Sequence, residues 1–209
     1  EAVELLKSTA SGKFNESVDI AIRLGIDPKQ SSQMVRGTVS LPHGTGKQVT
    51  ALVLCNPEQE KDAKNAGADF VGLEEYVEKI SKGWTDVDVI ITTPQIMPKI
   101  AKLGKILGPR GLMPNPKSGT VTTDVVKTVK EVKAGKIDFK IEKTGIIHSI
   151  IGKVAFTSEQ LTENVNEFVQ TVNSLKPPSS KGIYLKSINI SSTMGVGFNI
   201  ETKAFIKSE

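Results

Sequence analysis

The chain has 209 residues, enough for one large domain or two small ones with a buried core. Hydrophobic residues make up 38% and charged residues 24%, and 18 glycines with 10 prolines are too few for a disordered or fibrous chain. No apolar run approaches the ~20 residues of a membrane helix, and no basic-then-apolar signal segment opens the chain, so we expect neither membrane insertion nor secretion.

A single cysteine, Cys55, excludes an internal disulfide and a cysteine-based zinc site. It lies in an apolar run, so we expect it in the core of a protein from a reducing compartment, the cytoplasm. The first residue, Glu1, already stands inside a helical pattern, so the natural protein is expected to extend upstream.

The charges are segregated along the chain, although the net charge is only +4. Nine acidic residues lie from Glu58 to Asp88, against four lysines. Between Asp88 and Asp124 there is no acid, but there are five basic residues: Lys99, Lys102, Lys105, Arg110 and Lys117. Such polarity favours a charged macromolecular partner, while an ordinary solvated surface fits the charges alone equally well.

In chain order, the first residues predict a short helix that ends near 11–12, a strand over 18–24 and a strand over 35–41 that stops at Pro42. The last part predicts strands over 137–141 and 146–154, joined as a hairpin through 143–145. A helix follows, with a capping box at Thr157 and Gln160 and an apolar stripe to Leu175, and then strands over 183–190 and 196–206. Both ends are therefore predicted to be α+β.

The middle of the chain has a different pattern. An apolar run over 49–55 predicts a strand buried on both faces, followed by a helix capped by Asn56. Strands over 69–71 and 87–92 then alternate with helices over 73–82 and 94–107. A last helix is expected after Thr123, with Val126, Val129 and Val132 facing inward. This alternation predicts a parallel sheet with helices on both faces.

None of the enzyme motifs considered, a phosphate loop, a dinucleotide fingerprint or a catalytic histidine, is complete in this sequence. The segment 44–47 contains Gly-Thr-Gly-Lys, but Leu41 and Gln48 stand where a phosphate loop needs Gly and Ser or Thr, so a flexible joint is favoured. No Gly-x-Gly-x-x-Gly follows a strand, and His43 and His148 lack partners at triad or zinc-site spacing. We therefore predict a noncatalytic protein without cofactor, metal or small-molecule substrate. The rival hypothesis is a small-molecule-binding α/β enzyme with its site where the strands end.

Two segments instead suit a polyanion. The loop 108–117 has three prolines that fix its path and two glycines that allow close approach, which suits contacts from Arg110 and Lys117 to phosphates. The turn 191–195 offers hydroxyls, a methionine and a glycine, which suit the sugar edge and shallow minor groove of RNA; we expect the Thr193 hydroxyl to donate to RNA without a role in folding stability. A rigid connector and an ordinary hairpin turn are the alternatives.

These segments, with several short motifs, resemble the bacterial family of large-subunit ribosomal protein one over essentially the whole chain. The motifs that carry the resemblance are Phe14–Val18, Val35–Gly44, Gly67–Asp69, Leu103–Val121, Lys143–Gly145 and Thr193–Gly195. The segment 103–121 is highly specific, whereas each short motif alone is weak. The basic stretch that usually precedes Glu1 in the family is absent from this sequence.

The resemblance implies a fold of two domains. Residues 1–44 and 136–209 would form an α+β rRNA-binding domain built from both chain ends. It would be interrupted by an inserted Rossmann-like α/β domain, residues 45–135, with a parallel sheet and a basic loop at 104–120. Two strands near 41–46 and 134–137 would form the hinge.

The resemblance also implies a function. The family binds large-subunit rRNA at the mobile stalk beside the tRNA exit site, assists release of deacylated tRNA, and represses translation of its own mRNA. The protein would be a monomer when free and would lie in the large ribosomal subunit in the cytoplasm. The rRNA surface would comprise Lys13, Phe14, Glu16, Ser17, Thr144, Gly145, His148, Gly152, Lys153, Ser191, Thr193, Met194 and Gly195. The residues facing tRNA or contacting phosphates would be Lys99, Lys102, Lys105, Arg110 and Lys117.

Overall fold

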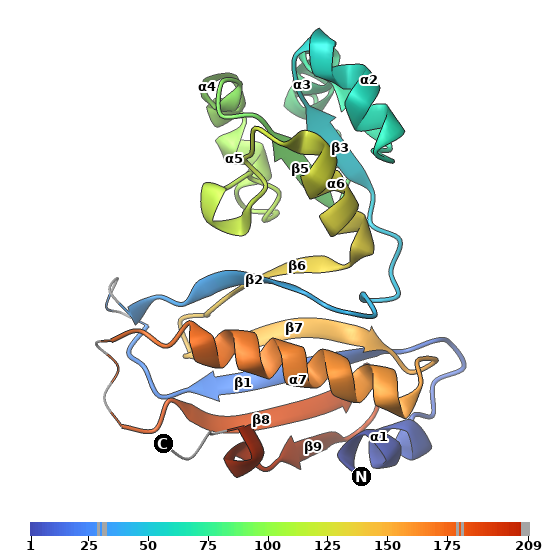
Figure 1. Cartoon of the computed structure of the whole chain (residues 1–209), viewed down its shortest axis with the longest axis vertical. Coiled ribbons are helices and arrows are strands. Elements are labelled where there is room, and N and C mark those ends of the chain that lie inside the picture. Colours follow the sequence, from blue (N-terminus) through green and yellow to red (C-terminus); the bar gives the residue numbers. More distant parts are fainter. Residues whose placement is uncertain (29, 31–32, 179, 181, 206–209) are drawn as a thin grey trace. The chain divides into compact units, whose positions relative to one another are not determined.

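The computed structural model describes residues 1–28, 30, 33–178, 180 and 182–205 (Figure 1). The chain forms two compact units: an end-built unit, Glu1–Gly46 with Gly135–Glu209, and an inserted unit, Lys47–Ala134. The mixed architecture, with one antiparallel and one parallel sheet, confirms the predicted fold class. That each unit folds as an independent domain stays a prediction.

The end-built unit is organised around a four-stranded antiparallel sheet in the order β7-β1-β8-β9. Its strands are β1 (Ser17–Leu24), β7 (Ile146–Lys153), β8 (Leu185–Ser192) and β9 (Gly197–Ile200). Alternate residues of β1, namely Val18, Ile20 and Ile22, are at most 1% exposed and pack in one core. Helices α1 (Ala2–Thr9) and α7 (Ser158–Ser174) contribute to the same core, and Figure 1 shows α7 running along one face of the sheet.

Helix α7 confirms two predictions. The Gln160 backbone N–H donates to Thr157 Oγ1 at 3.2 Å, and the Thr157 N–H donates to Gln160 Oε1 at 3.0 Å, so the capping box is present. The predicted stripe of Leu161, Val165, Phe168 and Val172 is at most 3% exposed. The cap and the stripe together decide where this helix starts and which face it buries.

The predicted hairpin of 137–141 with 146–154 forms only beside its turn, and the predicted ladder between the two strands is wrong. Strand β6 (Lys136–Lys140) pairs instead with β2 (Arg36–Ser40) in a separate two-stranded sheet, and β7 pairs with β1. The two segments meet at an isolated antiparallel bridge between Ile141 and Ile147 and at the turn, where the Glu142 N–H donates to Ile146 O at 3.0 Å. Both strands find more extensive ladders elsewhere, which local sequence does not reveal. The predicted strand 196–206 is also too long, because β9 ends at Ile200 and a 3-10 turn, η3 (Thr202–Phe205), follows; residue 206 lies outside the described residues.

The inserted unit contains a parallel three-stranded sheet in the order β4-β3-β5. Its strands are β3 (Ala51–Leu54), β4 (Phe70–Gly72) and β5 (Val89–Thr92), and its helices are α2 (Pro57–Asn65), α3 (Glu74–Ser81), α4 (Met97–Ala101), α5 (Gly104–Leu107) and α6 (Val125–Ala134). Leu52 and Leu54 share a core with residues of α3, α4 and α5, whereas Val53 shares one with residues of α2 and α6. Helices therefore cover both faces, as predicted.

Cys55 is a core residue, as predicted. Its side chain is 0% exposed in the cluster that α2 and α6 cover, and burial raises the pKa of its thiol to about 11. The thiol therefore stays protonated at neutral pH.

Three local predictions in the inserted unit are wrong. Residues 94–107 form not one helix but two, because Leu103 turns the chain with its N–H donating to Ile100 O at 2.8 Å. The Asn56 side chain does not cap α2; it donates to Gln95 Oε1 at 3.4 Å.

Helix α6 is capped one residue later than predicted. The cap is Asp124, whose Oδ1 accepts from the Lys127 N–H at 3.2 Å, rather than Thr123. The inward stripe accordingly begins at Val125 instead of Val126, since Val125, Val129 and Val132 follow helical spacing and are at most 4% exposed.

Among the residues that the structure describes, no helix has the length and apolar character of a membrane span.

One buried polar residue ties α7 to the segment that leaves the end-built unit. Asn164 is 0% exposed, and its Nδ2 donates to Ile151 O at 2.8 Å and to Gly44 O at 3.0 Å. Its Oδ1 accepts from the His43 N–H at 3.2 Å. This side chain therefore satisfies one backbone group of β7 and two in the segment 43–44, which has no regular secondary structure.

We expect Asn164→Ala to lower the free energy of unfolding of the end-built unit by about 2–4 kcal/mol, because buried backbone groups lose their partners. Urea unfolding followed by far-UV circular dichroism measures this loss. Fluorescence of Trp84, the only tryptophan, reports the inserted unit and should be unchanged. Asn166→Ala, a half-buried position on the same helix, is the matched control. Equal stability of the two variants would contradict the assigned role.

Candidate RNA interface

The sheet of the end-built unit has a second face that points away from α7. Asp19 of β1 lies opposite Ile150 of β7 and Ser191 of β8, and Ala21 lies opposite His148 and Asn189. These residues alternate with the buried ones, and Arg23, His148 and Ile150 are exposed. We call this surface the open face; it comprises Ser17, Asp19, Ala21, Arg23, Ile146, His148, Ile150, Lys153, Ser187, Asn189, Ser191 and Asn199.

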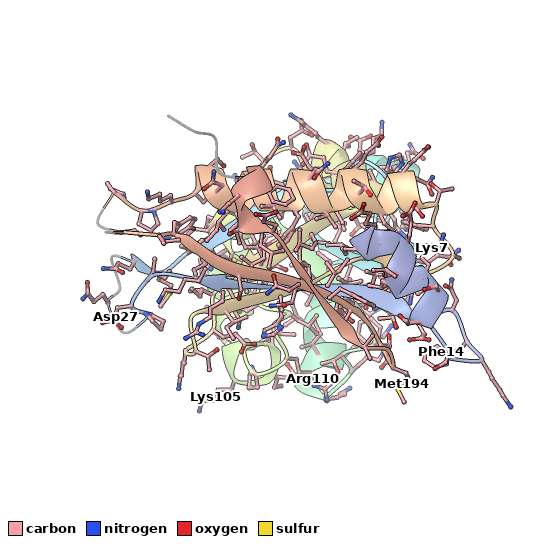
Figure 2. All side chains as sticks on the ribbon, turned by 90° about the horizontal axis from the view of Figure 1, so that it is seen from below. Lys7, Phe14, Asp27, Lys105, Arg110 and Met194 are labelled. Carbon is pink, nitrogen blue, oxygen red and sulfur yellow. The ribbon has the colours of Figure 1, made fainter. Side chains whose placement is uncertain are left out.

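One end of the open face carries two exposed apolar side chains. Phe14 is 57% exposed and Met194 is 70% exposed. In Figure 2 both side chains project away from α7. We call this pair the apolar tip. A solvated loop rarely keeps two large apolar side chains exposed together, so the apolar tip is suited to contact with a partner.

A buried carboxylate holds the apolar tip in place. Glu16 is 1% exposed; its Oε1 accepts from the Gly12 N–H at 2.7 Å and its Oε2 from the Met194 N–H at 2.8 Å. These bonds join the loop that carries Phe14 to the turn that carries Met194. Because the carboxylate is occupied inside the protein, Glu16 positions the predicted site instead of forming part of its exposed surface.

The hydrogen bonds also hold Glu16 in its charged form. The Met194 N–H lowers the pKa of the carboxyl group most, and the Gly12 N–H lowers it as well. A carboxylate that accepts several hydrogen bonds resists protonation. The turn is therefore fixed by a negative charge at neutral pH.

Thr193 also has an internal role. Its Oγ1 accepts from the Ser17 N–H at 3.0 Å, and its own N–H donates to Ser17 O at 3.1 Å. Lys153 Nζ donates to Ser17 Oγ at 2.8 Å, so this end of the sheet is closed by side-chain contacts. The expectation that the Thr193 hydroxyl serves RNA alone is therefore corrected, because the hydroxyl also joins the strand ends.

The structure divides the thirteen predicted rRNA-binding residues among three places. Thr144 and Gly145 lie at the other end of the sheet, where the Leu24 N–H donates to Gly145 O at 2.9 Å. Strand β7, with eight residues, separates the two ends by roughly 25 Å, and His148 lies between them. The remaining ten gather at or beside the apolar tip: Lys13, Phe14, Glu16, Ser17, Gly152, Lys153, Ser191, Thr193, Met194 and Gly195.

Two of the predicted glycines are buried. A Cβ at Gly152 would lie 2.8 Å from Leu161 Cδ2, so this glycine allows α7 to pack closely on β7. Gly145 has a φ of 79°, which favours glycine, and turns the chain into β7. Both glycines therefore contribute to the predicted site through their backbone conformation and not through an exposed side chain.

Sequence reasoning missed the middle of the open face. Asp19, Arg23, Ile150 and Asn189 lie between the two predicted clusters. The signal was present, because the period of two that buries Val18, Ile20 and Ile22 places the intervening residues on the opposite face. Only the strand order, however, shows which residues of β7 and β8 join them.

The five predicted basic residues all belong to the inserted unit, but they do not follow one helix. Lys99 is on α4, Lys105 is on α5, and Lys102 lies at the break between them. Lys99 Nζ lies 4.0 Å from Glu74 Oε1, and the Arg110 guanidinium donates to Thr85 Oγ1. Lys102, Lys105 and Lys117 are exposed.

In the described part of the chain, no three His, Cys, Asp or Glu side chains are grouped as a metal site requires.

Comparison with known proteins identifies the family. The sequence profile of the Ribosomal protein L1p/L10e family matches residues 6–196. The chain is 63% identical to Large ribosomal subunit protein uL1 of Bacteroides fragilis over 204 residues, which cover 98% of this chain and 88% of that protein. Proteins of the same name from Phocaeicola vulgatus and Flavobacterium johnsoniae are 63% and 60% identical, over 97% and 98% of this chain and 88% and 89% of theirs.

The chain therefore belongs to the Ribosomal protein L1p/L10e family, which confirms the resemblance drawn from its motifs. Membership of this family makes the chain a structural ribosomal protein. The relatives are named as proteins of the large ribosomal subunit, which agrees with the location that the resemblance implies.

We expect Glu16→Gln to loosen the turn at Met194, because an amide replaces one acceptor oxygen with a donor that faces a backbone N–H. The urea midpoint should be lower than in the wild type at pH 7. Since folding lowers the pKa of Glu16, its stabilisation is present above the pKa of the unfolded chain and is lost as the pH falls through the folded value. The difference between the two proteins should therefore narrow below about pH 4; a constant difference would contradict the role of the charge.

Proposed function

We propose that this protein binds large-subunit rRNA at the mobile stalk through the open face and apolar tip of the end-built unit. The observation that carries the proposal is the apolar tip itself: Phe14 and Met194 are exposed, and the buried Glu16 carboxylate accepts from Met194 and from Gly12, two residues before Phe14. Membership of a ribosomal protein family supports RNA as the partner.

The chemistry of the surface fits RNA. An aromatic ring and a methionine can pack on bases or riboses, and small polar groups such as Ser191 can contact 2′-hydroxyls in a shallow minor groove. Lys13 and Lys153 lie at the same end and supply charge for phosphates. The distance of roughly 25 Å between the apolar tip and Thr144 suits an extended, structured RNA rather than one nucleotide.

The inserted unit has a separate job in this proposal. Its exposed cations Lys102, Lys105 and Lys117 would attract tRNA at the exit site and so assist release of deacylated tRNA. The protein would also repress its own mRNA by binding a similar RNA shape. It would act as a monomer when free, without catalysis, in the large ribosomal subunit of the cytoplasm; no observation favours the rival α/β enzyme.

Phe14→Ala and Met194→Ala should each weaken binding of a stalk RNA fragment by about 1–3 kcal/mol, because stacking contacts of the tip are lost. Filter binding at fixed salt measures the change. Ile183→Ala is a matched control, since Ile183 is as exposed as Met194, at 70%, but lies outside the open face. If the control loses as much affinity as the two tip variants, the apolar tip is not the contact.

Deleting Lys47–Ala134 tests the division of labour. A Cβ at Gly135 would clash with Gly44 Cα, two residues before Gly46, so a short Gly-Ser linker can join Gly46 to Gly135. Affinity for stalk RNA should stay within about tenfold of the full chain's affinity, or ~1.4 kcal/mol. Binding of tRNA should weaken, and the salt dependence of tRNA binding should be lost. A collapse of stalk RNA affinity in a variant that circular dichroism shows to be folded would place the primary RNA site on the inserted unit.

A further inference from the structure

The open face has one acidic residue at its centre. Asp19 lies between Ile150 and Ser191 in the strand register and is half-buried. All other members of the open face are neutral or basic. A carboxylate is unfavourable on a surface that binds phosphates, because it repels them.

The Asp19 carboxylate is not used by the fold. Among residues 1–28, 30, 33–178, 180 and 182–205, none donates a hydrogen bond to it or forms an ion pair with it. Lys153, whose charge lowers the pKa of Asp19, donates its hydrogen bond instead to Ser17 Oγ at 2.8 Å. Burial raises the pKa of Asp19 more than the charges of Lys153 and His148 lower it. The carboxylate is therefore partly dehydrated but still lacks a direct partner.

An RNA seated on the open face would remove more water from this group. A buried carboxylate without a donor is strongly unfavourable, so only an RNA that presents a donor at this point can bind well. RNA offers such donors in the ribose 2′-hydroxyl, the exocyclic amines and the imino N–H groups, but not in its phosphates. The neighbouring Ile150, 41% exposed, adds an apolar contact that also excludes water.

We propose that Asp19 is a specificity-determining residue of the RNA site: it accepts a hydrogen bond from an O–H or N–H donor of the bound RNA and rejects RNA that places a phosphate there. This inference rests on the proposed function, because it takes the open face as the RNA-binding surface. The basic residues supply affinity for any RNA, whereas Asp19 discriminates among RNAs.

The test compares a stalk RNA fragment with a scrambled RNA of the same length, using the full chain. Asp19→Ala should weaken binding of the stalk RNA about tenfold and strengthen binding of the scrambled RNA two- to threefold at low salt, because the acceptor and the repulsion are both removed. Glu167→Ala is the charge-matched control: Glu167 is exposed on α7, which covers the opposite face of the sheet, and its removal should not change the ratio of the two affinities.

Two further arms identify the donor and the kind of contact. Single 2′-deoxy or inosine-for-guanosine substitutions in the stalk RNA should weaken wild-type binding at one position and have no further effect on Asp19→Ala; a deoxy position identifies a ribose donor, and an inosine position identifies a guanine amine. Asp19→Asn keeps an acceptor oxygen, so it should bind at least threefold more tightly than Asp19→Ala. Equal affinity of the two variants would mean that only the charge matters, as for a bridging cation, and would overturn the proposal.

The remaining outcomes separate this inference from the proposed function. If wild-type protein binds the stalk RNA no better than the scrambled RNA, the proposed function fails. If it discriminates, but Asp19→Ala discriminates equally or binds both RNAs more tightly, the role of Asp19 is overturned and the proposed function stands. Circular dichroism of each variant confirms that altered binding does not reflect unfolding.

Discussion

Strand β1 holds the end-built unit together, because it pairs with both β7 and β8 and sends alternate side chains into the core. Val18, Ile20 and Ile22 are each at most 1% exposed, and full burial of such a side chain stabilises a protein by about 1.5–3 kcal/mol. The same period of two leaves Ser17, Asp19, Ala21 and Arg23 on the other face. The core and the open face are thus two consequences of one strand, and a slip of one residue in its register would destroy both.

The apolar tip depends on electrostatics more than on packing. Two exposed apolar side chains cannot be held by a core, so the loop and the turn that carry them need polar contacts. Glu16 provides these by accepting from the backbone of both segments. A buried carboxylate without a basic partner is tolerated here because backbone N–H groups solvate it, just as they stabilise anions elsewhere in proteins.

Asp19 and Glu16 show two ways in which an acid can serve an RNA-binding surface. Glu16 is satisfied inside the fold and fixes the geometry of the turn, whereas Asp19 is half-buried, has no partner among the described residues, and in our proposal selects which RNA groups can approach. The difference follows from their neighbours: Glu16 faces free backbone N–H groups at a strand end, while Asp19 lies in mid-strand, where the ladders already use those groups. An RNA-binding surface thus gains specificity from a residue type that opposes affinity.

Much of the fold was predictable from the sequence by itself, because local patterns have local causes. The capping box at Thr157, the stripe of α7 and the buried parallel strand β3 all follow from residue spacing, and the long motif at 103–121 with its companions indicated the family. The alternation of β1 likewise separated core residues from surface residues. What the tertiary structure decided was pairing: β6 joined β2 instead of β7, and the predicted RNA residues were distributed over both ends of one sheet. It also decided which polar groups have partners: Glu16 and Thr193 form internal hydrogen bonds, whereas Asp19 has no partner among the described residues. Strand partners and hydrogen bonds to Glu16 join residues up to 178 positions apart, and no local pattern records which distant groups will meet.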